Sequence, residues 1–215
     1  MTGKPCPGPG MESVVLDNSM TERLTVRMLS LNEIRAVYRE RIVDDFPENE
    51  IKPLKMIERA CTRGEYRCYG GFTGEALAAY AFFVTIRENG QAVWLFDYLA
   101  VERERRDQGI GSAFLQALSQ EILPEAEMVL LEIDDPAAAE GEELARRLRR
   151  EAFYARNGLI DTGTTAQVFS ADFRILEIPV HGTHTKEACR AGYDAIYRRL
   201  LPPLLFRHNI HISQM

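Results

Sequence analysis

Residues 106–112 read Arg-Asp-Gln-Gly-Ile-Gly-Ser, and this stretch decides the fold. It lies between a hydrophobic strand pattern that ends at Val101 and an amphipathic helical pattern that begins at Ala113. Gly109 and Gly111 carry no Cβ, so the backbone can approach a ligand closely. The loop leads directly into a helix, whose first N–H groups have no partner inside the helix. Such a helix start attracts anions, and the stretch therefore predicts a loop that binds a pyrophosphate.

The residues on both sides of this loop predict a strand, loop, helix, strand unit. The apolar residues after the loop recur at helical spacing; they are Ala113, Phe114, Ala117, Leu118 and Ile122. Pro124 ends that helix, and a short apolar strand follows at Met128–Ile133. A crossover of this kind makes its two strands parallel, with a right-handed connection. The loop is then expected at the carboxyl end of the strand that finishes at Val101, which is where ligands bind in such sheets.

The rest of the chain predicts further helices and strands, in an order typical of an α/β (α+β) protein. Ser30 and Glu33 are spaced as a capping box at a helix start. Asn89-Gly90 predicts a tight hairpin and Thr73-Gly74 predicts another, so the strands beside them should be antiparallel. The predicted helices span residues 31–44, 53–62, 142–157 and 185–200, and the predicted strands span residues 24–28, 65–71, 76–87, 92–101, 164–170 and 174–180.

The composition is that of a soluble globular protein. The chain has 215 residues, of which 46% are hydrophobic and 27% charged, and no apolar run approaches the ~20 residues that a membrane span needs. The formal net charge of −6 argues against nucleic acid as a partner and favours a cationic substrate. Residues 1–10 lack the apolar core of a secretory signal. We therefore expect a cytoplasmic protein with neither a membrane nor a nucleic acid as its partner.

The cysteines and histidines predict no metal site. Cys6, Cys61, Cys68 and Cys189 contain no Cys-x-x-Cys pair, which favours reduced structural thiols over a zinc site or a disulfide framework. The two His pairs, at residues 181 and 184 and at residues 208 and 211, have no acidic or cysteine ligand at a recognisable spacing.

Three kinds of nucleotide-type ligand could occupy residues 106–112. A P-loop requires a lysine after its last glycine, but Ser112 follows Gly111 and no lysine comes next. A dinucleotide-binding loop requires a third small residue, and Phe114 occupies that position. The remaining pattern is Arg-x-x-Gly-x-Gly after the strand end at residues 99–101. A glycine-containing helix start that binds nothing is the structural alternative.

This remaining pattern resembles the GNAT family of acyl-CoA-dependent N-acetyltransferases, especially its bacterial members. The order of elements agrees with that family from about residue 23 to residue 180. The resemblance implies a mixed central sheet of about six to seven strands flanked by helices, here with an extra C-terminal helix. It also implies that acetyl-CoA is the acetyl donor, with pantetheine along the strand end and the pyrophosphate in the loop. The implied cofactor-binding residues are Leu99, Ala100, Val101, Arg106, Asp107, Gln108, Gly109, Ile110, Gly111 and Ser112.

The resemblance also suggests a division of the chain. Residues 1–20 are expected to be a disordered leader, and residues 21–182 to form the acetyltransferase domain. Residues 183–215 are expected to be a helical extension packed on the same domain. This extension lies beyond the resemblance, and it could cover the acceptor groove or form a homodimer contact.

A second segment with a chemical role is Phe153-Tyr154-Ala155-Arg156-Asn157-Gly158-Leu159. It resembles the Phe-Tyr-x-x-x-Gly-hydrophobic segment of the family, in which the tyrosine commonly protonates the departing thiolate. The resemblance therefore implies Tyr154 as the catalytic acid. The structural alternative is that Tyr154 only packs beside Phe153, with its hydroxyl at the surface.

Three acidic residues near the end of the strand at 128–133 are candidates for the catalytic base. They are Glu132, Asp134 and Asp135, and period-two alternation points the first two the same way. One of them could accept the proton of the amine through water, while the others attract a cationic acceptor. Glu132 is our choice because it should be held within the strand. A solvated acidic loop is the structural alternative.

The predicted helix at 142–157 departs from the family pattern. Many members have asparagine seven residues before the tyrosine and a small residue four before it, where this chain has Arg147 and Arg150. The four arginines at 146, 147, 149 and 150 could bind the 3′-phosphate of CoA. We favour a salt-bridged helix face, in which Glu142 pairs with Arg146 and Glu143 with Arg147.

These observations predict an N-acetyltransferase that moves acetyl from acetyl-CoA to a primary amine of a small molecule or peptide. The amine would attack directly in a ternary complex, because no cysteine lies near the implied thioester. A non-catalytic acyl-CoA-binding or sensing module is the alternative. The residues that should select the acceptor carry no readable code.

Overall fold

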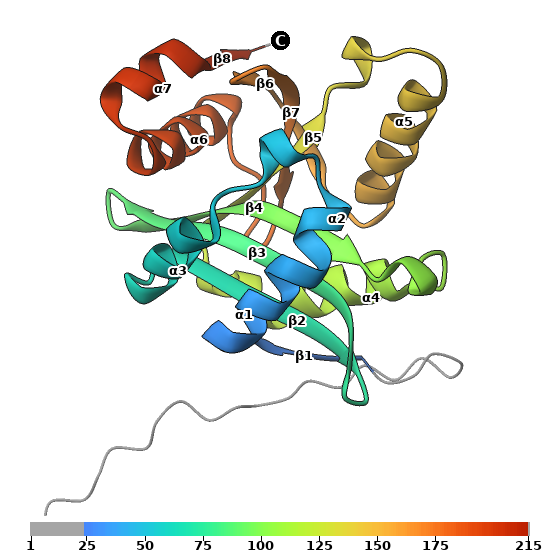
Figure 1. Ribbon diagram of the computed structural model, residues 1–215. Helices are drawn as coiled ribbons and strands as arrows, with labels where there is room; N and C mark the ends of the chain where they lie inside the picture. Colours follow the sequence, from blue (N-terminus) through green and yellow to red (C-terminus); the bar gives the residue numbers. More distant parts are fainter. Residues whose placement is uncertain (1–23, 215) are drawn as a thin grey trace, which may run out of the picture.

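The computed structural model describes residues 24–214, so the predicted leader lies outside the described residues. These residues form a mixed sheet of eight strands in the order β1-β2-β3-β4-β5-β7-β6-β8 (Figure 1). Only β4 and β5 pair in parallel among the strands described. The strands are β1 Leu24–Met28, β2 Tyr66–Thr73, β3 Ala76–Glu88, β4 Gln91–Val101, β5 Met128–Asp134, β6 Ile160–Val168, β7 Ala171–Ile178 and β8 Ile210–Gln214. The predicted mixed α/β fold is confirmed, with eight strands where about six to seven were expected.

Helices cover both faces of the sheet. Buried side chains of α1, α3 and α6 join one apolar core, and those of α4 and α5 join the other. The helices are α1 Leu31–Val37, α2 Val43–Asp45, α3 Leu54–Thr62, α4 Ile110–Ala117, α5 Gly141–Arg156, α6 Lys186–Leu200 and α7 Pro203–Asn209. A π-helical turn, η1 Tyr38–Ile42, joins α1 to α2, and a second, η4 Leu118–Ile122, extends α4. Short 3₁₀ turns are η2 Glu48–Glu50, η3 Arg103–Arg105, η5 Leu123–Glu125 and η6 Pro136–Ala138.

The central strand β3 shows why both faces need helices. Tyr80, Phe82 and Val84 enter the core under α1, α3 and α6, while Ala81 and Phe83 enter the core under α4 and α5. Successive side chains of a strand point to opposite faces, so a continuous apolar run predicts a strand that is buried on both sides. The run in β3 is therefore the sequence signature of a three-layer arrangement.

The predicted local signals are present in the structure. Ser30 caps α1, and the Glu33 carboxylate accepts a hydrogen bond from the Ser30 backbone N–H at 2.8 Å. Asn89 and Gly90 both have positive φ, at 50° and 84°, as the tight turn between β3 and β4 requires.

The sheet and α4 approach each other closely at Gly71 of β2. A Cβ on this residue would lie 2.8 Å from Cδ2 of the fully buried Phe114. Glycine therefore allows α4 to lie directly against the sheet, with the Phe114 ring filling the space. This contact positions the start of α4, and with it the loop at residues 106–112.

The chain after α6 contains two elements that the sequence did not predict. The helix α7 begins beside Pro202 and Pro203, and the strand β8 then pairs antiparallel with β6 at the edge of the sheet. Phe206 of α7 and Ile210 of β8 are buried in the same core as α6. The C-terminal segment therefore contributes a strand to the sheet as well as helices.

Candidate active site

The two parallel strands at the centre of the sheet separate toward their carboxyl ends. β4 and β5 pair only over residues 93–96 and 128–131, although β4 continues to Val101 and β5 to Asp134. Over these last residues each strand stays paired with its outer neighbour, β3 or β7. The strand end at residues 99–101 therefore presents an edge that is open to a molecule with peptide-like hydrogen-bonding groups.

A β-bulge in β4 accounts for this separation. The pairing of β3 with β4 shifts its register between Phe82 and Phe83, which leaves Asp97 of β4 without a partner on β3. An extra residue in one strand bends and twists that strand locally. The bulge follows immediately after Phe96, the last residue of β4 that pairs with β5. The bend thus coincides with the start of the gap.

The predicted pyrophosphate loop leads into the N-terminal end of α4. Gly109 is the residue before α4 and has a φ of 80°, a conformation that favours glycine. No side chain caps the first N–H groups of α4. Asp107 also has a positive φ, of 61°, and Gln108 donates to the Glu104 carbonyl at 2.9 Å. The loop thus leaves the first backbone N–H groups of α4 free of side-chain caps, as an anion site requires.

Close packing explains why the second glycine of the loop, Gly111, carries no side chain. A Cβ on Gly111 would lie 3.2 Å from Cζ of Phe153 in α5 and 3.3 Å from the Val101 side chain. The missing Cβ lets α4 begin directly against α5 and the end of β4. As a result the loop lies beside the segment that contains Tyr154.

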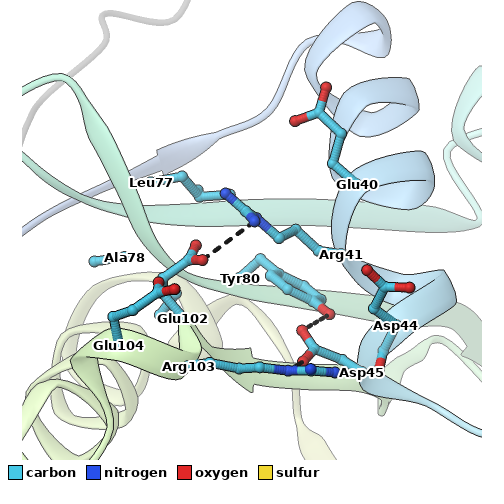
Figure 2. A pocket seen from close by; sticks show the side chains of 11 residues that line it. Glu40, Arg41, Asp44, Asp45, Leu77, Ala78, Tyr80, Glu102, Arg103 and Glu104 are labelled. Atoms are coloured by element: carbon cyan, nitrogen blue, oxygen red, sulfur yellow. Dashed lines mark hydrogen bonds and ion pairs between the residues drawn. The ribbon is translucent and has the colours of Figure 1, made fainter.

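Arg106 is held by protein groups. Its Nε donates to the Val101 carbonyl at 3.1 Å, and its Nη2 lies 3.0 Å from Oδ1 of Asp45. Asp45 also accepts a hydrogen bond from the Tyr80 hydroxyl at 3.0 Å and lies 3.6 Å from Nε of Arg103 (Figure 2). The Asp45 carboxylate therefore ties α2 to β3, to Arg103 and to the first residue of the loop, Arg106.

The surroundings of Asp45 form a small polar pocket of about 110 Å³ (Figure 2). Its charged side chains are largely paired with one another. Arg41 lies 3.2 Å from Glu102, and Arg103 donates to the Asp44 carbonyl at 2.5 Å. We interpret this pocket as a polar junction between α1–α2 and η3, rather than as the site of chemistry.

A larger cavity, of about 500 Å³, lies where β4 and β5 separate. Side chains from six parts of the chain line it: the segment from Phe46 to Met56, the ends of β4 and β5, α5, the β6–β7 turn and the end of α6. Three of the predicted site residues, Leu99, Glu132 and Tyr154, line this one cavity. Asp134 lines it as well. Asp135 instead caps η6, where its carboxylate accepts from the Ala137 N–H at 3.0 Å.

Glu132 is partly buried and is held by two tyrosines of α6. Its Oε1 accepts a hydrogen bond from the Tyr197 hydroxyl at 2.6 Å and another from the Tyr193 hydroxyl. Burial raises the pKa of Glu132, while the two hydrogen bonds and the nearby Lys52 act in the opposite direction. Burial also raises the pKa of both tyrosines well above the ordinary value, so each remains a proton donor. Glu132 is therefore a carboxyl group whose pKa is moved toward neutrality.

A partly buried ion pair lies near Glu132. Nζ of Lys52 contacts Oδ1 of Asp97, and Oδ2 of Asp97 accepts from the Tyr66 hydroxyl. Burial opposes the charged form of Lys52, but the Asp97 carboxylate outweighs it and raises the pKa of the lysine. Tyr98 accepts from the Lys52 backbone N–H at 2.7 Å, which fastens the segment before α3 to β4. The bulged Asp97 thus anchors one wall of the cavity.

Tyr154 lies in the opposite wall. It is buried, and its ring packs edge-on against Phe153 with 5.3 Å between centroids. The guanidinium carbon of Arg150 lies 6.0 Å from the Tyr154 ring centroid, and Arg150 Nη1 lies 3.2 Å from Asp134 Oδ2. Arg150 thereby joins the end of β5 to α5 across the cavity.

The arginines of α5 divide into two groups. Arg147 pairs with Glu143 at 2.8 Å, as predicted. Arg146 pairs with Glu143 as well, at 2.7 Å, and not with Glu142 as predicted. Arg146 thus pairs with the carboxylate three residues before it, at i, i+3 spacing, instead of the one four residues before it. Arg150 is different because it faces the cavity rather than the solvated face of the helix.

Several residues of the cavity were missed by the sequence analysis. They are Glu50, Lys52, Asp97, Arg150 and Tyr197. Tyr193, which bonds to Glu132 without lining the cavity, was missed as well. Asp97 sits inside an apolar strand pattern, and a charged residue at such a position is the one signal that could have drawn attention to it. The tyrosines follow the apolar spacing of α6 and gave no signal of their own.

The geometry defines the class of protein, and the family comparison agrees with it. The model of the acetyltransferase (GNAT) family matches residues 32–148, more than half of the chain. This protein therefore belongs to the GNAT family of acetyltransferases. No protein of curated function matches the chain in sequence.

Solved structures with the same fold include several acetyltransferases. One GNAT-family structure from Bacteroides thetaiotaomicron has a TM-score of 0.58 and 18% identity, covering 78% of this chain and 92% of that chain. The ribosomal-protein-S18-alanine N-acetyltransferase of Escherichia coli has a TM-score of 0.53 and 19% identity, covering 75% and 96%. A spermidine N-acetyltransferase of Vibrio cholerae has a TM-score of 0.55 and 11% identity, covering 72% and 92%. At these identities the likeness establishes the fold.

Further features of residues 24–214 bear on the chemistry. In this part of the chain, no helix is long and apolar enough to cross a membrane. The same residues contain no group of three or more His, Cys, Asp or Glu side chains arranged to hold a metal ion. Cys61, Cys68 and Cys189 are free thiols, and none of them lines the cavity between β4 and β5.

Proposed function

We propose that this protein is an N-acetyltransferase that moves acetyl from acetyl-CoA to a primary amine. One observation carries the proposal. The gap between β4 and β5 has an uncapped helix start near one end, and Glu132 and Tyr154 line the cavity at the other. These features match an elongated donor: its phosphate end would bind at the start of α4, its peptide-like middle along the open edge of β4, and its reactive end in the cavity.

The donor-binding role falls to residues 99–101 and 106–112. The open edge of β4 offers backbone groups to pantetheine, and the N–H groups at the start of α4 offer partners to the pyrophosphate. Acetyl-CoA supplies an acetyl group activated as a thioester, whose carbonyl carbon the amine attacks and whose carbon–sulfur bond then breaks. Arg106 adds positive charge to this end of the site, where Asp45 now holds it.

Glu132 is assigned the role of general base. An amine reaches the cavity as an ammonium ion and must lose a proton before it can attack. The carboxylate of Glu132 accepts that proton, directly or through a water molecule. Tyr193 and Tyr197 position the carboxylate and favour its ionised form through their hydrogen bonds.

Tyr154 is assigned the role of general acid. Its hydroxyl gives a proton to the departing thiolate, so that the products are the amide and free CoA. The ammonium loses two protons in all. The first passes through Glu132 to solvent, and the second, lost from the amine nitrogen after its attack, restores the Tyr154 hydroxyl, so that one proton is released overall. No covalent enzyme intermediate is required, in keeping with the absence of a cysteine from the described lining of the cavity. The three free thiols also support a reducing, cytoplasmic location.

The test is amine-dependent release of CoA thiol from acetyl-CoA. We expect release with at least one member of a panel of alkylamines, polyamines, amino acids, aminoglycosides and peptides. Release with none of them, despite binding of acetyl-CoA, would favour the non-catalytic binding or sensing module. A burst of acetyl-enzyme on mixing with acetyl-CoA alone would contradict direct attack.

The acid role has its own test in Tyr154→Phe. We expect kcat to fall about 100-fold, the typical contribution of a positioned proton donor, while the Kd for acetyl-CoA changes little. Phe153→Leu is the matched control, because its side chain packs beside Tyr154 but carries no proton. An unchanged kcat in folded Tyr154→Phe would show that the tyrosine only packs.

A further inference from the structure

The charges that line the cavity are unevenly paired. Six charged side chains line it, and they are Glu50, Lys52, Asp97, Glu132, Asp134 and Arg150. Asp97 is paired with Lys52, and Asp134 lies 3.2 Å from Arg150. Each cation of the cavity therefore already has a carboxylate in contact with it. The other two carboxylates have no cation of the described residues within ion-pair distance, although Lys52 acts on Glu132 and Arg150 acts on Glu50 at longer range.

The two remaining carboxylates are Glu50 and Glu132. Glu132 accepts hydrogen bonds from neutral tyrosine hydroxyls. The Glu50 side chain makes no hydrogen bond or ion pair with any residue that the structure describes. Burial raises the pKa of both carboxyl groups, and Asp134 adds to the effect at Glu50, where Arg150, Arg146 and Arg147 oppose it without cancelling it. Two carboxylates whose ionised form is disfavoured by burial would gain from a cation placed beside them.

The rest of the acceptor side of the cavity is mainly apolar. Its side chains come from the segment before α3, from β7 and from the end of α6, and they include Phe46, Ile51, Met56, Phe173, Leu200 and Leu201. A second charged group on the acceptor would have to lie among these side chains. Burying a charge without a partner is unfavourable.

We infer that the acceptor is a primary amine with one cationic nitrogen and an apolar body, and that its ammonium group binds at Glu50 and Glu132. This inference rests on the proposed function for its chemistry, but it concerns binding and can be tested separately. The Glu50 carboxylate attracts and orients the ammonium, and Glu132 removes its proton. The aliphatic and aromatic side chains bind the body of the molecule. A polyamine or an amino acid would bring a further charge, and the cavity would have no partner left for it once the first ammonium engages both Glu50 and Glu132.

Three probes of equal reach isolate the effect of that further charge. Hexylamine, 1,5-diaminopentane and 6-aminohexanoate share the same ammonium group and differ at the far end, which is a methyl, an ammonium and a carboxylate. Their Kd values are measured by calorimetry on the full chain, with and without CoA. We expect hexylamine to bind at least 10-fold more tightly than either of the others. Equal or tighter binding of the diamine or the amino acid would overturn the inference.

The variant Glu50→Gln tests the ammonium site itself. We expect the Kd of hexylamine to rise about 10-fold and the Kd of CoA to stay the same. Glu48→Gln is the matched control, because Glu48 belongs to the same turn but is exposed and does not line the cavity. An unchanged Kd of hexylamine in Glu50→Gln would refute the site.

The inference and the proposed function can fail independently. If hexylamine binds preferentially but releases no thiol from acetyl-CoA, the acceptor site stands and the transferase proposal fails. If the diamine is acetylated more efficiently than hexylamine, the transferase proposal stands and the acceptor inference fails.

Discussion

The hydrogen bond from Tyr197 to Glu132 links a residue of α6 to the base that we propose. A donor that bonds to a carboxylate stabilises its ionised form, so its removal should raise the pKa of Glu132 further. In Tyr197→Phe we expect the acidic limb of the kcat/KM profile to move about one unit to higher pH, given about 1.5 kcal/mol for a hydrogen bond to a charged group. The measurement is kcat/KM between pH 5 and 9 with the best acceptor of the panel.

Tyr193→Phe should move the same limb in the same direction, because Tyr193 donates to the same oxygen of Glu132. Tyr69→Phe serves as the control, since Tyr69 is a buried tyrosine of the other core. If the acidic limb of the kcat/KM profile stays at the same pH in both α6 variants, Glu132 is not the group whose protonation lowers kcat/KM at low pH.

Glu33 shows a pH effect of a different kind, on stability. The hydrogen bond from Arg27, at 2.6 Å, lowers the pKa of Glu33 to about 2, and the backbone and hydroxyl of Ser30 add to this. A carboxyl whose pKa is lowered in the folded state stabilises the fold above its unfolded pKa and loses this effect as the pH falls. Because the side chain is 36% exposed, solvent screening reduces the gain to about 1 kcal/mol.

In Glu33→Gln we therefore expect the free energy of unfolding to drop by about 1 kcal/mol at pH 7, and by much less at pH 2. Urea denaturation at the two pH values measures the difference. The control is Glu40→Gln, which removes an exposed charge from the next turn. Asn32→Asp would be unsuitable because it adds a charge. An equal loss at both pH values would mean that ionisation of Glu33 is not the cause.

At the level of the elements, the sequence predicted the order and type of most helices and strands. The reason is that their signals are local: a capping box at Ser30, turn residues at Asn89-Gly90, and a glycine at 158 that ends α5 with a φ of 85°. The loop at 106–112 also carries its own signal, because the glycines and the flanking patterns lie within one short stretch. These features need no knowledge of what packs against them.

The walls of the cavity could not be predicted in the same way. Lys52 and Asp97 meet across 45 residues of chain, and Glu132 and Tyr197 across 65. Neither pairing has a periodicity or spacing that reveals it in a single sequence. The strand β8 was missed for a related reason, since a five-residue strand after two prolines forms only because the edge of β6 is available to pair with it.

The contact between β2 and α4 gives a prediction about packing. In Gly71→Ala the new Cβ would come within 2.8 Å of Phe114, whose ring is surrounded by the core and cannot move freely. We expect a loss of about 1–3 kcal/mol in the free energy of unfolding. Phe114→Leu should destabilise on its own, yet the double variant should lose less than the sum of the two. Additive losses in chemical denaturation would show that the two residues do not compete for space.

For the molecule as a whole, the C-terminal segment is part of the same folding unit as the family domain. Tyr193 and Ile196 of α6 are fully buried in the core that also contains Phe82 of β3. We expect that a chain ending at residue 185 would not fold cooperatively, because it would expose this core and leave Glu132 without its donors.

A shorter deletion separates the roles of the last two elements. Removal of residues 203–215 takes away α7 and β8, including the buried side chains of Phe206 and Ile210. We expect a folded protein whose free energy of unfolding is lower by about 3–6 kcal/mol, since each such side chain contributes about 1.5–3 kcal/mol. Calorimetric unfolding measures this loss, and an unchanged Tm would show that the segment adds nothing to the domain.

Under the proposed function, Asp45 would couple the binding of the two substrates reciprocally. The carboxylate holds Arg106 at the donor loop, and the chain continues from it directly into the segment at residues 46–56, which forms a wall of the acceptor cavity. A phosphate group that drew Arg106 toward itself would weaken the ion pair between Arg106 and Asp45 and change the mobility of residues 46–56. Thermodynamic linkage then requires that the acceptor change the affinity for the donor by the same factor as the donor changes the affinity for the acceptor.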